Sequence, residues 1–333
     1  MRVTQRPWPR GSATGLGSVP GTDPLEAART VFGELPDLPH LAELPDRGAG
    51  ADMIGRASIL LVDLPVQIEP SGWRFTSRPG IDLRRARDFL ARDLDALEQV
   101  AHSREGAVKV QVAGPLTLAA SVELVNGQRA IADHGAVREI AESLTEGLSR
   151  HLAGIRSRLP AAALVVQVDE PAVPAVLSAR IPTASGYGTL RAVSAQIVQE
   201  RLATVLAAAE PGHRAVHCCA ADAPIGLFRR AGADAVAIEA DLLTAAGLDE
   251  LGEAVDAGVA LWLGVVASNG PIPPAAKVAD RVARLWGRLG FDPGLLADSI
   301  VLTPSCGLAG AAPAEARRVM TVVRQAAERL RES

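Results

Sequence analysis

The fold is indicated most clearly by residues 235–265, which read AVAIEADLLTAAGLDELGEAVDAGVALWLGV. A short apolar run at 235–238 is followed by a helical pattern over 248–257 and then by a second apolar run at 259–265. Strands that are apolar on both faces are typical of parallel sheets, because helices cover such sheets on both sides. The stretch therefore predicts a strand–helix–strand unit with parallel strands.

The same alternation continues on both sides of this unit. Further strands are predicted at 108–112, 164–168, 214–217 and 299–302, and further helices at 23–35, 82–101, 129–158, 194–209, 224–231, 275–289 and 313–330. The first 80 residues are rich in proline and glycine; 11–22 reads as a strand end with a glycine-rich loop, and 36–50 as a loop with little pattern.

Six clear strands follow residue 107, and one or two more are expected in the first third of the chain. That total favours a closed (β/α)8 barrel, or TIM barrel, over the alternative of an open doubly wound sheet. A length of 333 residues is normal for one such barrel. We therefore expect residues 1–333 to form a single domain, with 1–11 as a flexible N-terminal segment.

Composition excludes several classes of function. A net charge of −4 and an aromatic content of 3% provide neither the basic field nor the stacking surfaces that nucleic acids need. No apolar run approaches the roughly 18 residues of a membrane span, and residues 1–17 lack the apolar core of a secretory signal. Three cysteines in a chain of this length do not make a disulfide scaffold. We expect a cytoplasmic protein without nucleic-acid or membrane partners.

Metal-binding residue types stand at the ends of three predicted strands. His217 and Cys219 end one strand, Glu239 ends the next, and Cys306 follows the last. The carboxyl ends of barrel strands meet at one face, where catalytic residues gather. Two thiolates, an imidazole and a carboxylate suit four-coordinate Zn²⁺, whereas strand alternation turns Cys218 to the other side.

Each of these residues also has a purely structural interpretation. A buried cysteine is usually a small apolar residue, and a single histidine is usually a core or surface residue. Glu239 follows three apolar residues and would need a charged partner if buried. The grouping of all the cysteines in two strand-end motifs nevertheless favours a metal site.

Zinc held by two thiolates is suited to binding a further thiol. It lowers the pKa of that thiol and keeps it as a nucleophilic thiolate at neutral pH. The predicted reaction is therefore alkyl transfer to the sulfur of a small thiol.

Four segments of the sequence resemble the C-terminal catalytic barrel of cobalamin-independent methionine synthase. They are Leu-Gly-Ser-Val-Pro at 16–20, Gly-Pro-Leu-Thr at 114–117, Val-Gln-Val-Asp-Glu-Pro-Ala at 166–172, and the metal motifs at 217–219, 238–239 and 305–308. The likeness covers roughly residues 14–330. It implies an S-methyltransferase that makes methionine from homocysteine, with zinc bound by His217, Cys219, Glu239 and Cys306.

The resemblance also implies a substrate site. Asp169, the candidate catalytic residue, would pair with the ammonium group of homocysteine, a role that suits a buried carboxylate in need of a cation. The expected substrate-binding residues are Leu16, Gly17, Ser18, Asp169, Glu170 and Asn269. For the pair Asp169–Glu170 the alternative is a helix or loop cap.

The sequence departs from the family pattern on the side that handles the methyl donor. Ser121 stands where the family has a tryptophan that stacks on the pterin, and Asn269 stands where it has a proton-transferring histidine. Asp52 and Met53 remain from a motif whose substrate-binding glutamate is absent, and nothing corresponds to the N-terminal barrel of longer members. We therefore expect a methyl-corrinoid protein, rather than methyltetrahydrofolate, as the donor.

Two other functions remain open from the sequence. One is a zinc-dependent alkyltransferase that acts on another thiol, which the absent glutamate favours. The other is a non-catalytic accessory protein that binds zinc or a thiol metabolite, which the loss of the histidine and the tryptophan favours.

Overall fold

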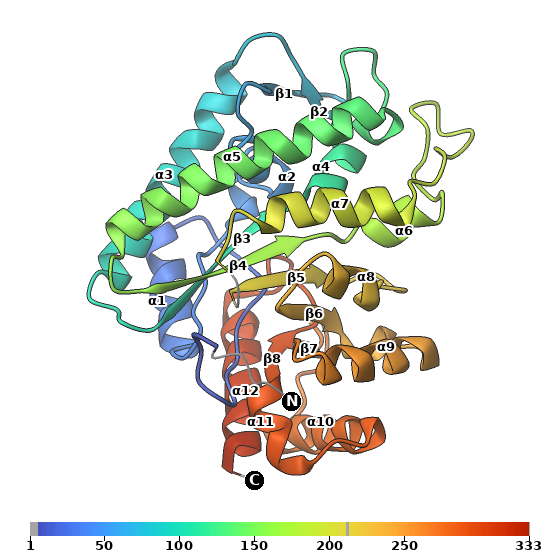
Figure 1. Cartoon of the computed structure of the whole chain (residues 1–333). Coiled ribbons are helices and arrows are strands. Elements are labelled where there is room, and N and C mark those ends of the chain that lie inside the picture. The colour runs from blue at the N-terminus through green and yellow to red at the C-terminus, as the bar shows by residue number, and fades with distance from the viewer. Residues whose placement is uncertain (1–5, 211–212, 333) are drawn as a thin grey trace.

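A six-stranded parallel sheet forms most of the barrel wall in the computed structural model, which describes residues 6–210 and 213–332 (Figure 1). The strands follow one another in chain order: β3 (Ala107–Ala113), β4 (Ala163–Asp169), β5 (Arg214–Cys218), β6 (Ala235–Glu239), β7 (Ala260–Val266) and β8 (Ile300–Pro304). All six predicted strands are confirmed. The chain folds as a (β/α)8 barrel.

The barrel is closed by two short N-terminal segments. Ala13 forms a parallel bridge with Leu302 of β8, and His40 forms one with Lys109 of β3. Ser18 and Glu43 bridge the two segments to each other. The segment 36–50, which was expected to be a loop with little pattern, is irregular, but it also makes the bridges that complete the barrel wall. Its prolines and glycines hide a segment that makes only a few ladder bonds, such as the one from the Leu41 amide to the Lys109 carbonyl (2.9 Å).

Helices surround the sheet in the order that the sequence predicts. The longer ones are α1 (Pro24–Glu34), α3 (Ile81–Ala101), α5 (His134–Arg158), α7 (Ala195–Leu206), α9 (Ala245–Asp256), α10 (Ala275–Leu289) and α12 (Pro313–Glu332). Asp23 caps α1 and Ser194 caps α7 through their side chains, as expected of these residue types. The helix predicted over 129–158 begins later, because Asp133 accepts from the first free amides of α5.

Shorter elements fill the connections. They are α2 (Met53–Ser58), α4 (Pro115–Ser121), α6 (Val173–Leu177), α8 (Ile225–Arg230), α11 (Leu296–Ser299), and the 3-10 turns η1 (Pro45–Arg47), η2 (Ala130–Ala132), η3 (Ala240–Leu242) and η4 (Pro293–Leu295). A separate antiparallel hairpin, β1 (Val66–Glu69) and β2 (Gly72–Phe75), is not part of the barrel sheet. The strands missing from the first third are therefore the bridging segments, not this hairpin.

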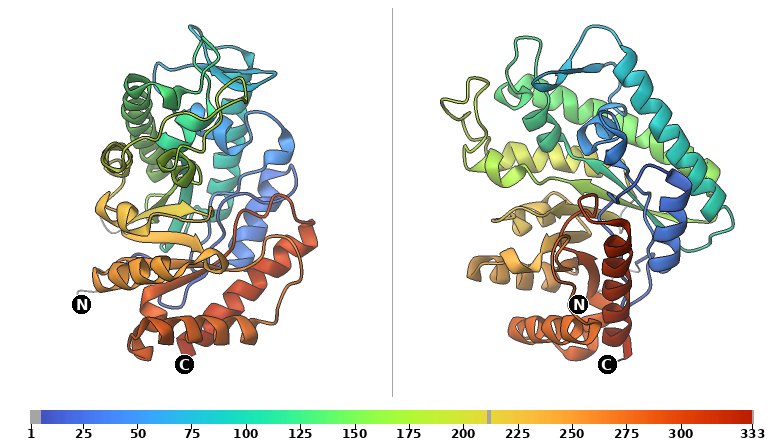
Figure 2. Two further views of the ribbon diagram at one scale, coloured as in Figure 1. Left: turned by 90° about the vertical axis from the view of Figure 1, so that its right-hand side faces the viewer. Right: turned by 180° about the vertical axis from the view of Figure 1, so that it is seen from behind.

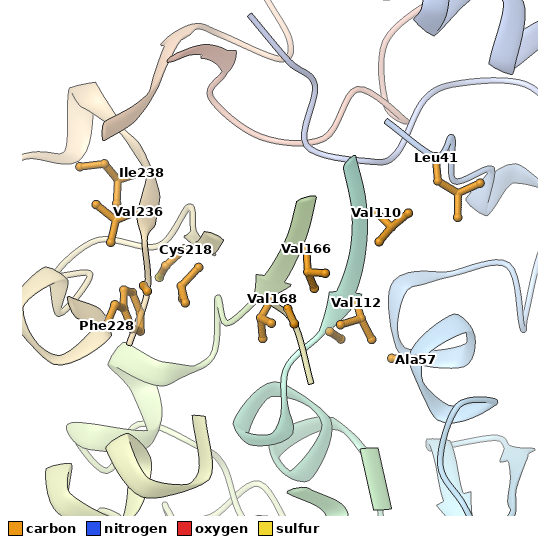
Figure 3. Packing of buried hydrophobic residues seen from close by; sticks show 14 of the residues in the cluster. Leu41, Ala57, Val110, Val112, Val166, Val168, Cys218, Phe228, Val236 and Ile238 are labelled. Atoms are coloured by element: carbon orange, nitrogen blue, oxygen red, sulfur yellow. The ribbon is translucent and has the colours of Figure 1, made fainter. Parts of the chain in front are cut away.

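The outward faces of the strands pack on the helices. Figure 3 shows Val166, Val168, Cys218 and Val236 lying in this apolar layer between sheet and helices. The inward faces form a second, smaller cluster that includes Val165, Ala215, Ala235, Ala237 and Trp262. The inward faces also carry polar side chains, including Gln167 and Asp169 on β4.

Both ends of the described chain are packed. Residues 6–11 were expected to be flexible, yet Trp8 is 7% exposed and its ring meets Trp262 edge-on, with centroids 5.5 Å apart. Residues 1–5 lie outside the described part of the chain. α12 packs against α1, and the view from behind in Figure 2 shows the two helices side by side. None of the described helices is long and apolar enough to cross a membrane.

Candidate functional site

Three of the four predicted metal ligands meet at the mouth of the barrel. His217 and Cys219 at the end of β5, and Cys306 after β8, line one cavity of about 290 Å³. Asp169 from the end of β4 lines the same cavity. The carboxyl ends of parallel strands thus bring together residues that are far apart in the sequence.

The two thiols interact directly. The Sγ atoms of Cys219 and Cys306 lie 3.3 Å apart and share a hydrogen bond. This bond, together with the nearby His217, lowers the pKa of Cys306 to about 6. The same bond and burial raise the pKa of Cys219. One thiolate is therefore favoured in this pair even before any cation is bound.

His217 is oriented by a carboxylate. Its Nδ1 lies 2.7 Å from Asp169 Oδ1, and the side chain is 6% exposed. Its Nε2 is buried and has no hydrogen-bond partner among the described residues. With the proton on Nδ1, the lone pair of Nε2 is free to bind a metal, and a carboxylate on the other ring nitrogen is the usual companion of a metal-binding histidine.

The predicted substrate loop closes one side of the cavity. Leu16 and Ser18 line it, and Gly17 between them has φ +124°. A Cβ at Gly17 would also come within 2.9 Å of the Gln111 side chain, so the position needs glycine for two reasons. The carbonyl of Leu16 accepts from Gln167 Nε2 at 3.0 Å, which joins the loop to β4.

Glu239 lies apart from the other three predicted ligands. Strand register places it on the inward side, beside Gly264, yet its side chain lines a separate cavity of about 220 Å³ between the loops that follow β5 and β6. Burial raises its pKa, and the neighbouring Asp241 adds to the effect. Within residues 6–210 and 213–332, no three His, Cys, Asp or Glu side chains are arranged as a ready metal site.

Glu170 has a structural role in place of the predicted substrate contact. It is fully buried on the opposite face of β4 from Asp169, and it accepts from the backbone amides of Leu116 and Thr117 at 3.0 and 2.8 Å and from Thr117 Oγ1 at 2.7 Å. These donors belong to the first turn of α4, so Glu170 caps that helix. Burial raises its pKa to about 7 against these donors.

Asn269 lies at the rim of the cavity. Its side chain is exposed, and its amide is 3.6 Å from the position that a Cβ on Gly310 would occupy. Gly310 itself lines the cavity. Asn269 itself does not line the cavity, and its role in substrate binding stays a prediction.

Sequence reasoning missed a set of buried polar residues inside the barrel. Glu43 lines the cavity, is 7% exposed, and accepts from Gln111 Nε2 at 3.0 Å, with Arg56 Nε 3.6 Å away. Burial raises the pKa of Glu43, and Arg56 opposes this. Lys109 and Gln167 lie behind it. A signal was present, because β3 and β4 carry polar residues at every second position of otherwise apolar strands.

Another cavity is larger but holds none of the predicted residues. It measures about 400 Å³ and lies between the first turns of α1 and α12. The smaller cavity at the barrel mouth is the better candidate because the reactive groups converge there.

Residues 12–329 match the model of a protein family described as cobalamin-independent synthase, catalytic domain. The chain belongs to this family. It is therefore a methyltransferase of the methionine synthase family, as the resemblance in the sequence predicted. No curated protein matches the chain by sequence.

A solved structure shares the fold of this synthase domain. A B12-independent methionine synthase from Shewanella sp. W3-18-1, in complex with selenomethionine, superposes with a TM-score of 0.63 at 12% identity, covering 97% of this chain and 98% of that one. A GH5_18 protein from Bifidobacterium longum subsp. infantis gives a TM-score of 0.47 at 12% identity, with 97% and 79% covered. A mutant tryptophan synthase α-subunit from Pyrococcus furiosus gives 0.41 at 11% identity, with 98% and 100% covered.

The family corrects one prediction. A methyl-corrinoid donor conflicts with membership of a cobalamin-independent synthase family. The prediction rested on the absence of a tryptophan and a histidine that the family pattern has. Ser121 and Asn269 stand at those two positions. The loss of a stacking ring and of an acid weakens one donor site, but it does not create another.

Proposed function

We propose that this synthase domain transfers a methyl group from a methyltetrahydropteroylglutamate to the sulfur of homocysteine, without cobalamin, and so forms methionine. The observation that carries the proposal is the convergence of His217 Nε2, Cys219, Cys306 and Asp169 on one cavity. The selenomethionine in the Shewanella structure is chemically close to the product proposed here.

The residues at the mouth suit zinc. His217 offers a buried, unpartnered Nε2, and Cys219 and Cys306 offer two sulfur ligands that already share a proton. When bound by such ligands, zinc holds a substrate thiol as a thiolate. Glu239 is the proposed fourth ligand, and its side chain must leave the neighbouring cavity to reach the other three. The fourth position is thereby the one that a substrate sulfur can take.

Two carboxylates favour an amino-acid thiol. Asp169 and Glu43 both line the cavity, and burial together with the charge of Asp169 raises the pKa of Glu43, while Arg56 and Lys109 oppose this. No described residue donates to Asp169 Oδ2, since Gln167 and His217 both use Oδ1. The ammonium group of homocysteine can pair with this free oxygen. Glu43, on a different segment, takes the place of the family glutamate that the sequence lacks.

Among the residues that the structure describes, the cavity offers no evident acid for the methyl donor. A methyl group leaves a tetrahydropteridine nitrogen readily only when that nitrogen is protonated. Asn269 can donate a hydrogen bond to it but cannot deliver a proton. The two acids that could replace the histidine, Asp52 and Glu170, are occupied as caps of α2 and α4 and do not line the cavity. We infer that protonation of the leaving nitrogen limits the rate.

The test uses the zinc-loaded protein with homocysteine and methyltetrahydropteroyl-triglutamate in the absence of cobalamin. We expect methionine to form, at a rate below the roughly 10 s⁻¹ of a median enzyme. Asn269→His should raise that rate by about tenfold or more, because it restores a general acid. Absence of methionine with the zinc-loaded wild type, or its formation only when methylcobalamin is supplied, would contradict the proposal. The free thiols of all three cysteines also suit the reducing cytoplasm that we propose as its location.

A further inference from the structure

Four charged side chains form a buried cluster beside the cavity, and the proposed chemistry uses only one of them. The cluster consists of Glu43, Arg47, Arg56 and Asp93. Each of the four side chains is at most 10% exposed. Buried charges cost free energy unless they are closely paired, and even a well-paired group of this kind often stabilises a protein less than apolar packing would. The cluster therefore needs a reason other than stability.

Asp93, on α3, holds both arginines of the cluster. Arg47 Nη1 lies 2.8 Å from Asp93 Oδ1, and its Nη2 donates to Oδ2 at 2.8 Å. Arg56 Nη1 donates to the same Oδ2. Arg47 ends η1 and Arg56 lies in α2, while Ala51 and Met53 between them in the sequence line the cavity. Asp93 thus fastens this wall of the cavity to α3.

The two arginines differ in what else they contact. Arg56 Nε lies 3.6 Å from Glu43 Oε1, and among the described residues Arg56 is the only cation within ion-pair distance of this carboxylate. Arg47 instead lies over the ring of Phe89, with its guanidinium carbon 4.8 Å from the ring centroid. Both arginines therefore pair with Asp93, but Arg56 alone of the two reaches the carboxylate that lines the cavity.

The contacts of Glu43 bear on its charge and its direction. Burial raises the pKa of Glu43 and so favours the neutral form, and Arg56 is the strongest influence that lowers this pKa. Arg56 and the Gln111 amide both contact Oε1, at 3.6 and 3.0 Å. No described residue donates to Oε2, although the side chain lines the cavity. A charged carboxylate with one free oxygen attracts an ammonium group strongly, whereas a neutral carboxyl does not.

We propose that Arg56 is a positioning residue that holds Glu43 as a carboxylate with one oxygen toward the cavity, and that this pair makes the site select thiols that carry a charged amino group. The inference rests on the proposed function, since it assigns Glu43 to the ammonium group of the acceptor. It gives the buried cluster its reason, because Asp93 holds the guanidinium of Arg56 and that guanidinium holds Glu43. Removal of Arg56 should leave Glu43 in its neutral form and the ammonium group without this partner.

The decisive measurement compares two thiols that differ only in the amino group. Homocysteine and 4-sulfanylbutanoate, which lacks that group, are titrated into the zinc-loaded protein in a calorimeter. We expect the wild type to bind homocysteine more tightly. Arg56→Met should lower this preference by about ten- to a hundred-fold, which corresponds to the loss of one charge-assisted hydrogen bond. Its Kd for 4-sulfanylbutanoate should stay within about threefold of the wild-type value.

Arg47→Met is the matched control. It takes a guanidinium away from the same Asp93 but not from Glu43, so it should lower the free energy of unfolding and leave the preference for homocysteine unchanged. Any effect of this variant on the cavity wall should change the affinities for both thiols alike.

Three further variants separate positioning from folding. Arg56→Lys keeps a cation beside Glu43 and should recover part of the preference. Arg56→Gln keeps a donor but no charge, so it should fold even if Arg56→Met does not, and it should lower the preference as well. In a double-mutant cycle, Arg56→Met should have no further effect on the preference once Glu43→Gln has removed the carboxylate.

An unchanged preference for homocysteine in Arg56→Met and Arg56→Gln, or an equal loss of it in Arg47→Met, would overturn the inference. Because the preference is a ratio of two affinities, a general disturbance of the cavity or of the zinc would affect both thiols and leave the ratio as it is. A wild type that binds the two thiols equally would contradict homocysteine as the acceptor in the proposed function. A wild type that shows the preference but forms no methionine would contradict methyl transfer alone, and the role of Arg56 would still be decided by the binding ratios.

Discussion

The inward and outward faces of the barrel strands carry the same residue types with opposite consequences. Asp169 and Glu170 are neighbours at the end of β4, and both are buried, at 5% and 0% exposure. Asp169 faces the cavity and orients His217, whereas Glu170 faces the helices and caps α4. Cys218 and Cys219 repeat this division at the end of β5, with Cys218 in the outer apolar layer (Figure 3).

The comparison shows that chemical identity and burial do not assign a role by themselves. The inward face presents a connected series of polar groups that ends at the barrel mouth, and substitutions there should change binding and catalysis. The outward face is an apolar layer in which Glu170 is an exception with a complete set of donors. Substitutions there should change stability and leave the cavity as it is.

The largest expected difference between the two faces concerns the cysteines. Cys219→Ser or Cys306→Ser should abolish stoichiometric zinc and lower methionine formation by about a thousandfold, because a metal supplies several kcal/mol to such a reaction. Cys218→Ser should retain zinc and activity, although its hydroxyl is buried in an apolar layer and costs some stability. Metal analysis of the purified proteins tests this prediction. Normal zinc content in Cys306→Ser would show that zinc is not bound by the residues of the inward face.

The next effect belongs to the outward face. Glu170→Ala leaves two amides and a hydroxyl without their acceptor and should lower the free energy of unfolding by about 2–4 kcal/mol. Because burial raises the folded-state pKa of Glu170 to about 7 from 4.5, the contribution is complete below the unfolded value and declines as the pH rises through 7. In urea unfolding experiments, the difference in the free energy of unfolding between wild type and variant should therefore become smaller as the pH rises from 5 to 8.

A matched binding measurement completes the test of Glu170. Homocysteine should bind Glu170→Ala within about threefold of the wild type, since this side chain does not line the cavity. A large loss of affinity at unchanged stability would show that the outward face communicates with the substrate site.

Asp169→Asn should have a somewhat smaller effect, on binding. The oxygen of the new side chain can still accept from Gln167 and His217. Its amide NH2 then points toward the substrate ammonium, so that a donor replaces the acceptor there. We expect a ten- to hundred-fold increase in the Kd for homocysteine, about 1.5–3 kcal/mol, with zinc retained. Calorimetric titration of the zinc-loaded variant measures it. Unchanged homocysteine binding would mean that another thiol is the acceptor.

The smallest effect is expected at the end of β6. Glu239→Gln should weaken zinc binding by less than about tenfold, because the side chain lies in the neighbouring cavity and has to move to become a ligand. Competition with a chelator gives the affinity. Complete loss of zinc in this variant would show that Glu239 contributes as much to zinc affinity as the two cysteines do.

Much of the barrel could be predicted because its strands are continuous apolar runs. Each of the six strands from β3 to β8 lies where such a run predicts it, with ends that differ by a residue or two. The two closing segments could not be predicted in this way. The segment at 36–50 is interrupted by Pro36, Pro39 and Pro45, and it joins β3 through only a few bonds around His40 and Leu41.

The candidate site shows the same limit. His217, Cys219, Cys306 and Asp169 were found because each ends a strand, and strand ends converge in a barrel. Glu43 and Lys109 were missed, since the first lies in a segment with little pattern and the second belongs to an alternation of polar residues, Lys109 and Gln111, in a strand that is otherwise apolar. Glu170 was predicted to contact the substrate because it stands beside Asp169 at the end of the same strand, and it does not line the cavity.

By itself the sequence determined the alternation of strands and helices, the family, and the reactive residues at the strand ends, because these depend on local pattern and on short motifs. Only the tertiary structure decided which of two adjacent carboxylates faces the cavity, that Glu43 lines the cavity, and that Lys109 is joined to His217 through two intervening side chains. The physical reason is that hydrogen bonds join groups by distance and direction, and barrel closure brings together residues that are up to about 290 positions apart, such as Ala13 and Leu302.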